Sequence, residues 1–416
     1  MLTGDTEEAK HFRINIRSYN NAFAFTSFGG KIDASINRGN APYVFKVGGQ
    51  VYHRHGTLLP DDGPPRYAQL YFHDGAEATL HRQGLNTSLR GPILLDLHHM
   101  LLESNHLIQH YLSAEEWFHA QPADVQETAH VHLHFDVASD RRCYNLPTGN
   151  DEVAVILPDP QHLTHAQSDT RDVIIRYRNP EGAQPQDLFH RIPNGSPLYI
   201  PLHYVLLFPH GELGWTWSMT QDPPGHRAAV RVNDHGDGLE DDADPQAEND
   251  GTRLSRMVWI AWMCFERAGN FSTLLRGGKL FQQWAVDQWA TLEQDRLLFL
   301  QHNQKTLRAD LYNGLADAAT VADNHHNPRS FGIPVILPSS FIGGARNMFQ
   351  LCQDSLAIGS FFNKIDLFVT ITANPKWPEI MDALLPGQTP SDCPDLVARV
   401  FNLKVKAILH DIYKLG

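Results

Sequence analysis

The sequence is poor in cysteine, in long apolar runs and in positive charge. Its four cysteines lie far apart and form no CxxC pair, which argues against a zinc ribbon or a dithiol redox centre and favours reduced thiols. No apolar run reaches the roughly 18 residues that a membrane-spanning helix needs, so no membrane association is expected. The first residues are polar and charged, unlike a secretory signal peptide, and we therefore expect an intracellular protein.

The charge is negative overall but unevenly distributed along the chain. The net charge of −13 argues against a dedicated nucleic-acid-binding protein. Residues 234–250, however, hold eight acidic residues and no lysine or arginine, and they lack the apolar side chains that a core requires. From residue 252 onward, 16 basic residues face 14 acidic ones, so this part is not repelled by DNA. Residues 234–251 are predicted to be an acidic linker or loop.

Two sequence features could serve phosphate chemistry, and neither is a complete motif. The segment "LRGGKLF" contains Gly-Lys, but Leu280 follows Lys279 where a nucleotide-binding P-loop needs a hydroxyl residue for Mg²⁺. Gly343 and Gly344 open a predicted helix whose amide groups could hold a phosphate. A tight turn before the helix is the favoured interpretation of these two glycines.

Histidines alternate with apolar residues in "AHVHLHFD", residues 129–136. On a strand, every second side chain points the same way, so His130, His132 and His134 would share one face. Neutral imidazoles so placed can bind a divalent metal, although a further ligand is normally required. Because the chain has 24 histidines, the pattern carries little information, and a histidine-lined strand without metal is favoured. A metal-binding module remains the alternative.

The pattern of short apolar runs and longer amphipathic ones predicts an α+β fold. Helical spacing predicts helices over residues 91–112, 279–318, 343–362 and 394–416. Alternating or short apolar runs predict strands in "QLYFHD", "EVAVILPD", "RDVIIRYRNPEG" and "KIDLFVTITANP". The segment "YVFKVGGQVYHRHG" is expected to form two strands joined by a Gly-Gly turn.

Four segments of the last third resemble the helicase-like N-terminal region of Helitron transposases. They are "DRLLFLQHNQKTLRADLYNGL" (295–315), "LPSSFIGGARNMFQLCQDSLAI" (337–358), "DLFVTITANPKWPEI" (366–380) and "CPDLVARVFNLKVKAILHD" (393–411), in the family's order and spacing. Earlier segments, such as "NIRSYNNAFAFTSFGGKID" and "PLHYVLLFPHGELGW", are similar to sequence that precedes this region in Helitron proteins. The resemblance divides the chain into an N-terminal α+β module (1–233), the acidic linker (234–251) and a helicase-like domain (252–416).

The resemblance implies a rolling-circle transposase, in which a Rep nuclease of the HUH class is joined to an ATP-dependent DNA helicase. Such nucleases hold a divalent metal between two histidines of a His-hydrophobic-His strand and attack DNA with tyrosine. "DLFVTITANPKW" resembles the strand before that metal strand, so the region would lead into an incomplete, ferredoxin-like HUH sheet. The metal-binding pair, the nucleophilic tyrosine and the Walker A motif are expected beyond Gly416, and this chain is expected to be inactive alone.

The implied role of this chain is DNA binding or scaffolding in a nuclear protein, with single-stranded DNA as the partner. We predict DNA contacts by Arg346, Asn347 and Gln350 on the helix after the Gly-Gly pair, and by Lys376 and Trp377. Basic groups would hold the DNA backbone, and Trp377 would stack on an unpaired base. Packing of Trp377 against the protein is the competing interpretation. A domesticated, non-catalytic interaction protein is a further alternative, and no catalytic residue, metal ligand or cofactor is assigned.

Overall fold

The computed structural model describes most of the chain in two units. The described residues are 1–37, 43–55, 64–72, 75–109, 112, 130–133, 154–157, 173–176, 190–191, 195–216, 219, 253–267, 269–303, 336–363 and 369–415. Unit 1 comprises Met1–Pro224, Thr252–Ala290 and Thr372–Gly416, and unit 2 comprises Gly225–Gly251 and Thr291–Ile371. The predicted acidic linker lies outside the described residues, so the predicted domain boundaries stay a prediction.

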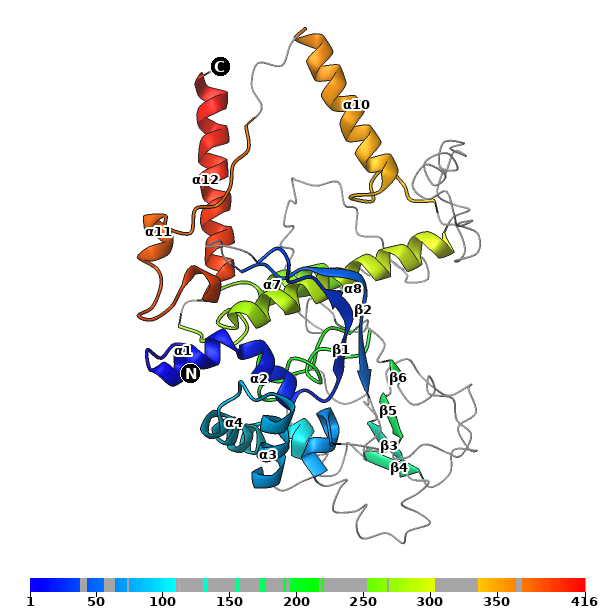
Figure 1. The fold of residues 1–416 in the computed structure, drawn as a ribbon. Helices are drawn as coiled ribbons and strands as arrows, with labels where there is room; N and C mark the ends of the chain where they lie inside the picture. Colours follow the sequence, from blue (N-terminus) through cyan, green and yellow to red (C-terminus); the bar gives the residue numbers. More distant parts are fainter. Residues whose placement is uncertain are drawn as a thin grey trace, which may run out of the picture. The chain divides into compact units, whose positions relative to one another are not determined.

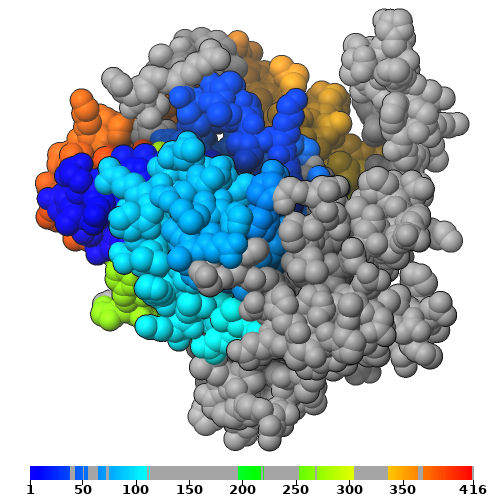
Figure 2. All heavy atoms as spheres, turned by 60° about the horizontal axis from the view of Figure 1, so that its bottom comes forward, coloured from blue at the N-terminus to red at the C-terminus, as the bar shows by residue number. Residues whose placement is uncertain are grey.

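Four N-terminal helices supply much of the core of unit 1. Helices α1 (Glu7–Ile14) and α2 (Ile16–Phe23) come first, and α3 (Gly75–Leu85) and α4 (Gly91–Ser104) follow after two strands and a 3-10 helix. The side chain of Thr6 accepts a hydrogen bond from the Ala9 amide and caps α1. In α4 the buried residues Ile93, Leu94, Leu97 and Leu101 recur at helical spacing. Figure 2 shows α3 and α4 at the surface of unit 1, with the N-terminal residues beside them.

A small antiparallel sheet in unit 1 corrects the predicted hairpin. Strands β1 (Ser27–Ile32), β2 (Val47–His55) and β6 (His190–Arg191) lie in the order β1-β2-β6 (Figure 1). The predicted Gly-Gly turn is wrong, because both glycines lie inside β2. The pairing of β1 with β2 is irregular near this point, and Gly49 has a φ of 79°. Glycine adopts this left-handed conformation without steric cost, which lets the strand continue through a bulge.

A second antiparallel sheet contains the histidine strand. Strand β3 (His130–Leu133) lies between β4 (Ala154–Leu157) and β5 (Val173–Arg176). These three predicted strands are confirmed. The segment "QLYFHD", by contrast, was predicted to be a strand, but Tyr67–Phe72 form a 3-10 helix, η1. Its neighbouring residues Leu70 and Tyr71 are both buried, which a strand with one exposed face does not allow.

The core of unit 1 joins residues from both sides of the acidic segment. Between residues 195 and 216 the chain runs through successive turns that bury Leu202, Tyr204 and Val205. These residues share one apolar cluster with α2, α4 and Trp284 of α8 (Gly278–His302). Helix α7 (Arg256–Met263) adds Trp259 to this cluster. The region after residue 252 is therefore built partly into the core of the preceding residues.

The helices near the end of the sequence agree with the predictions, but one strand does not. Helices α10 (Ala345–Phe361) and α12 (Pro394–Leu415) are confirmed, and α8 confirms the beginning of the predicted helix 279–318. Short helices α11 (Pro378–Met381) and η5 (Pro390–Asp392) precede α12.

The strand predicted over 364–375 is wrong for residues 369–374, which form no secondary structure. None of the described strands pairs with them, and an unpaired strand leaves its backbone groups to water. The predicted HUH-type sheet is therefore not seen in the described residues. None of the described helices is long and apolar enough to span a membrane.

Candidate nucleic-acid interface

The three residues of α10 that were predicted to contact DNA differ in their surroundings, because the turn before the helix engages one of them. Gly343 has a φ of 78°, and Gly344 is the N-cap residue directly before α10. The Asn347 side chain accepts a hydrogen bond from the Gly343 amide at 3.2 Å and donates one to the Ser339 carbonyl at 2.8 Å. Asn347 therefore braces the turn, whereas Gln350 is exposed and Arg346 is half-buried.

Trp377 packs against α12 in unit 1. Its ring stacks on Phe401 with 6.5 Å between the centroids and 12° between the planes. The Lys404 ammonium group lies 5.8 Å from the centroid of the Trp377 ring and also pairs with Glu379. These contacts favour the packing interpretation of Trp377. Its neighbour Lys376 is exposed, and its backbone amide bonds to the side chain of Asn374.

The structure describes two of the three histidines on the strand that was considered as a metal site. His130 and His132 lie in β3, two residues apart, but His134 lies outside the described residues. Within the described part of the chain, no group of three or more His, Cys, Asp or Glu residues is arranged to hold a metal ion.

A buried polar cluster in unit 1 was not predicted from the sequence. Asp287 of α8 lies at its centre, and its carboxylate is fully buried. One carboxylate oxygen is 2.9 Å from Nε2 of His53 and accepts a hydrogen bond from the Tyr204 hydroxyl at 2.8 Å. The other oxygen accepts a hydrogen bond from the Tyr199 hydroxyl at 3.0 Å. The cluster ties β2 and the turns of 195–216 to α8.

The two histidines of this cluster have different hydrogen-bond partners. Nδ1 of His53 lies 3.0 Å from the Tyr199 carbonyl and donates to it, while its Nε2 lies 2.9 Å from the Asp287 carboxylate. His203 instead donates from Nδ1 to the Thr26 carbonyl, and its Nε2 faces the amide nitrogen of Gln283. The Gln283 oxygen accepts a bond from Arg17, which sets the amide's orientation and requires a neutral His203.

The pKa shifts of His203 and Asp287 agree with a neutral His203 imidazole and an ionised Asp287 carboxylate. Burial, together with the nearby His53, lowers the pKa of His203 to about 3. Burial by itself would raise the pKa of Asp287, but the attraction of His53 and hydrogen bonds from His53 and Tyr204 hold it below its usual value. Because all these side chains are fully buried, the cluster cannot reach a substrate. The cluster stabilises the core of unit 1 by linking β2, residues 195–216 and α8.

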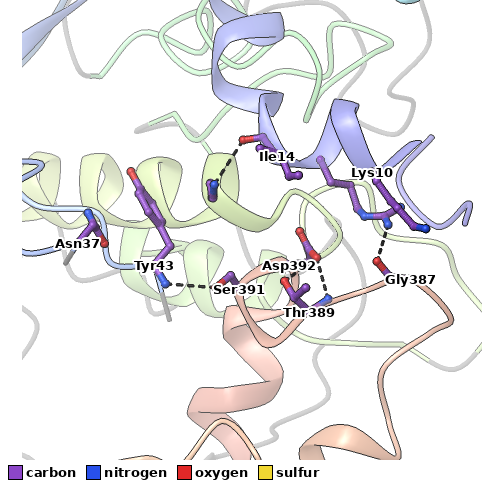
Figure 3. A pocket seen from close by; sticks show the side chains of 10 residues that line it. Lys10, Ile14, Asn37, Tyr43, Gly387, Thr389, Ser391 and Asp392 are labelled. Atoms are coloured by element: carbon purple, nitrogen blue, oxygen red, sulfur yellow. Dashed lines mark hydrogen bonds between the residues drawn. The ribbon is translucent and has the colours of Figure 1, made fainter. Parts of the chain in front are cut away.

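A basic cavity of about 430 Å³ lies at the surface of unit 1, between α1 and the start of α8. Figure 3 shows Asn37 and Tyr43 on one side and Lys10 and Gly387 on the other, with Thr389, Ser391 and Asp392 of the η5 segment between them. Its lining residues are Lys10, Arg13, Ile14, Asn37, Tyr43, Lys279, Gly387, Thr389, Ser391 and Asp392.

The sequence contained only one sign of this cavity. The Gly-Gly-Lys segment at Lys279 resembles an incomplete P-loop. Its partners Lys10 and Arg13 lie more than 250 positions away in the sequence, so no local pattern links them to it. The predicted DNA contacts are not among the residues that line the cavity: Arg346, Asn347 and Gln350 belong to unit 2, and Lys376 and Trp377 belong to unit 1.

Comparison with known families gives one match. Residues 259–416 match the model of the Helitron helicase-like domain found at the N-terminus of such proteins. No curated protein matches the chain. The matched residues include α8, α10, α11 and α12, and they contribute Lys279 and the η5 segment to the basic cavity. Residues 259–416 are therefore similar to the Helitron helicase-like domain.

Proposed function

We propose that this chain is the DNA-binding or scaffold part of a Helitron-type rolling-circle transposition protein. The match of residues 259–416 to the Helitron helicase-like family is the observation that carries the proposal. The charge distribution supports it, because the residues after 252 have a small basic surplus although the whole chain carries −13. Because its partner would be chromosomal DNA, we also propose that the protein works in the nucleus.

The DNA contacts in this proposal come from side chains that are accessible to a phosphate backbone. Lys376 is exposed beside α11, and Gln350 is exposed on α10, with the half-buried Arg346 one turn before it. Lysine and arginine bind phosphates largely through charge, so affinity should fall as salt rises. Asn347 is assigned to the turn before α10 rather than to DNA, and Trp377 to packing on α12.

The proposal includes no catalytic step. The full-length family implies a divalent metal and ATP, but the described residues do not fit either group. The Gly-Gly-Lys segment lacks the hydroxyl residue of a P-loop, because Leu280 follows Lys279 and is itself buried. The described residues also offer no cluster of three metal-ligating side chains.

Fluorescence anisotropy with labelled single-stranded and duplex oligonucleotides tests the proposal. We expect binding that is tighter for the single strand and that weakens with salt. Each lost phosphate contact should reduce the slope of log affinity against log salt by about 0.7 on single strands. Lys376→Ala and the double variant Arg346→Ala/Gln350→Ala should each weaken binding and lower this slope.

Lys31→Ala is the matched control, because Lys31 is an exposed lysine on β1 outside the matched region. It removes the same charge and should leave the affinity unchanged. Absent or salt-independent binding of the wild-type chain would contradict the proposed function. Equal losses in Lys31→Ala and Lys376→Ala would contradict the assignment of Lys376 as a contact.

A further inference from the structure

We propose that the basic cavity between α1 and the start of α8 binds the phosphate group of a nucleotide-sized ligand. This site rests on the proposed function in one respect, because DNA bound by the chain would be a source of the phosphate. The cavity lies wholly within unit 1, so its walls are positioned by one core.

Arg13 is the strongest indication of an anionic ligand. The residue is only 4% exposed, and its guanidinium group donates to three backbone carbonyls, those of Gly4 at 2.6 Å, Gly387 at 2.7 Å and Met1 at 3.4 Å. It forms no ion pair with an acidic side chain of the described residues. A buried charge without a counter-ion is costly, and these carbonyl dipoles compensate it only in part. An anion in the cavity would supply the missing negative charge.

Lys279 of α8 contributes a second positive charge to the lining of the cavity. It lies in the first turn of the 25-residue helix α8, and this turn contains no acidic residue. Its ammonium group lies 3.4 Å from the Ile14 carbonyl and 5.2 Å from the centroid of the Tyr43 ring. The positive end of the helix dipole and the lysine therefore act together at this wall, and both favour an anion.

The remaining polar groups leave the cavity with a positive balance. Among the lining residues that the structure describes, Asp392 is the only carboxylate, and it already accepts hydrogen bonds from the Thr389 amide and hydroxyl at 2.8 Å each. The Ser391 hydroxyl accepts a bond from the Tyr43 amide at 3.2 Å and keeps its own proton for a ligand oxygen. Lys10 at the edge is shared with Asp5 and Glu7 and contributes less.

The size and walls of the cavity indicate more than an inorganic ion. A volume of about 430 Å³ lies in the range of small-molecule sites, which is roughly 300–1,000 Å³, and exceeds what one phosphate needs. Tyr43 and Ile14 add aromatic and aliphatic surface beside the cationic wall (Figure 3). The ligand class that fits is a nucleoside monophosphate, either free or as one unit of a single strand.

Thermal shift and calorimetric titration of the full chain test the phosphate site. The probes are a deoxynucleoside monophosphate, the same nucleoside without phosphate, and inorganic phosphate. We expect the monophosphate to bind and to raise Tm, inorganic phosphate to bind more weakly, and the nucleoside to have no effect. Lys279→Gln should weaken monophosphate binding about tenfold, in line with the loss of a charge-assisted contact. Ser391→Ala should weaken it less, and Lys31→Ala should not change it.

A competition experiment identifies the source of the phosphate. If the monophosphate displaces a labelled single-stranded oligonucleotide, the cavity takes a unit of the strand, and if it binds without displacing the strand, the cavity takes a free nucleotide. Both results support the site. Oligonucleotide binding without any monophosphate binding, and unchanged by Lys279→Gln, overturns the cavity site and leaves the proposed function standing. Monophosphate binding without DNA binding supports the cavity site and contradicts the proposed function. Equal binding of nucleoside and monophosphate overturns the phosphate assignment.

Discussion

At the scale of single residues, the neutral His203 should make stability depend on pH. Its pKa is about 3 in the folded chain and about 6.5 for an unperturbed histidine, so the unfolded state binds the proton first. The contribution is complete above pH 6.5 and is lost as pH falls from 6.5 towards 3. In that window His203 should contribute a slope of about 1.4 kcal/mol per pH unit to the free energy of unfolding.

Urea unfolding followed by tryptophan fluorescence at several pH values measures this slope. The His203→Asn variant should show a flatter profile than the wild type between pH 4 and 6.5. The exposed His410 on α12 is the control, and His410→Asn should keep the wild-type slope. An unchanged slope in His203→Asn would contradict the assignment of a neutral, buried imidazole.

Asp287 is the residue on which the buried cluster depends most. Asp287→Asn would remove the carboxylate that faces Nε2 of His53 and would disturb the hydrogen bonds from two tyrosine hydroxyls. Breaking a buried ion pair by removing one partner costs about 3–5 kcal/mol in the free energy of unfolding. The same measurement on Asp354→Asn, at an exposed position of α10, should differ from the wild type by less than about 0.5 kcal/mol. A neutral effect of Asp287→Asn would mean that the cluster does not stabilise the core.

At the scale of elements, the contact of Trp377 with α12 separates packing from DNA stacking. Trp377 is half-buried against Phe401, so Trp377→Ala should lower the free energy of unfolding by about 1–3 kcal/mol, less than a fully buried tryptophan would cost. Phe401→Ala should produce a similar loss, and the double variant should lose less than the sum because the two rings share one contact. A large fall in DNA affinity with unchanged stability would instead support base stacking.

The secondary structure that local sequence dictates was predictable, and the exceptions have physical reasons. Helices α10 and α12 follow from helical spacing, and β3, β4 and β5 follow from short apolar runs. The 3-10 helix η1 was mistaken for a strand because short apolar runs do not reveal whether neighbouring side chains are both buried. The Gly-Gly pair of β2 was mistaken for a turn because a glycine also serves a bulge.

At the scale of the whole molecule, the stretch that matches the family model does not form a core by itself. Trp284 and Asp287 lie in the Helitron-like region, yet they pack and bond with residues of the first part of the chain, such as Tyr204 and His53. The matched region therefore depends on the preceding residues for part of its core. The basic cavity has the same origin, with Arg13 from one part and Lys279 from the other.

The sequence by itself determined the similarity of residues 259–416 to the Helitron helicase-like domain, through motifs whose order and spacing can be read along the chain. It also determined helices such as α10 and α12 through their periodicity. Only the tertiary structure decided which charges meet. Arg13 and Lys279 line one cavity, and His53 and Asp287 form one ion pair, although each pair is separated by more than 230 residues. Long-range packing brings such groups together, and no local pattern of residues records it.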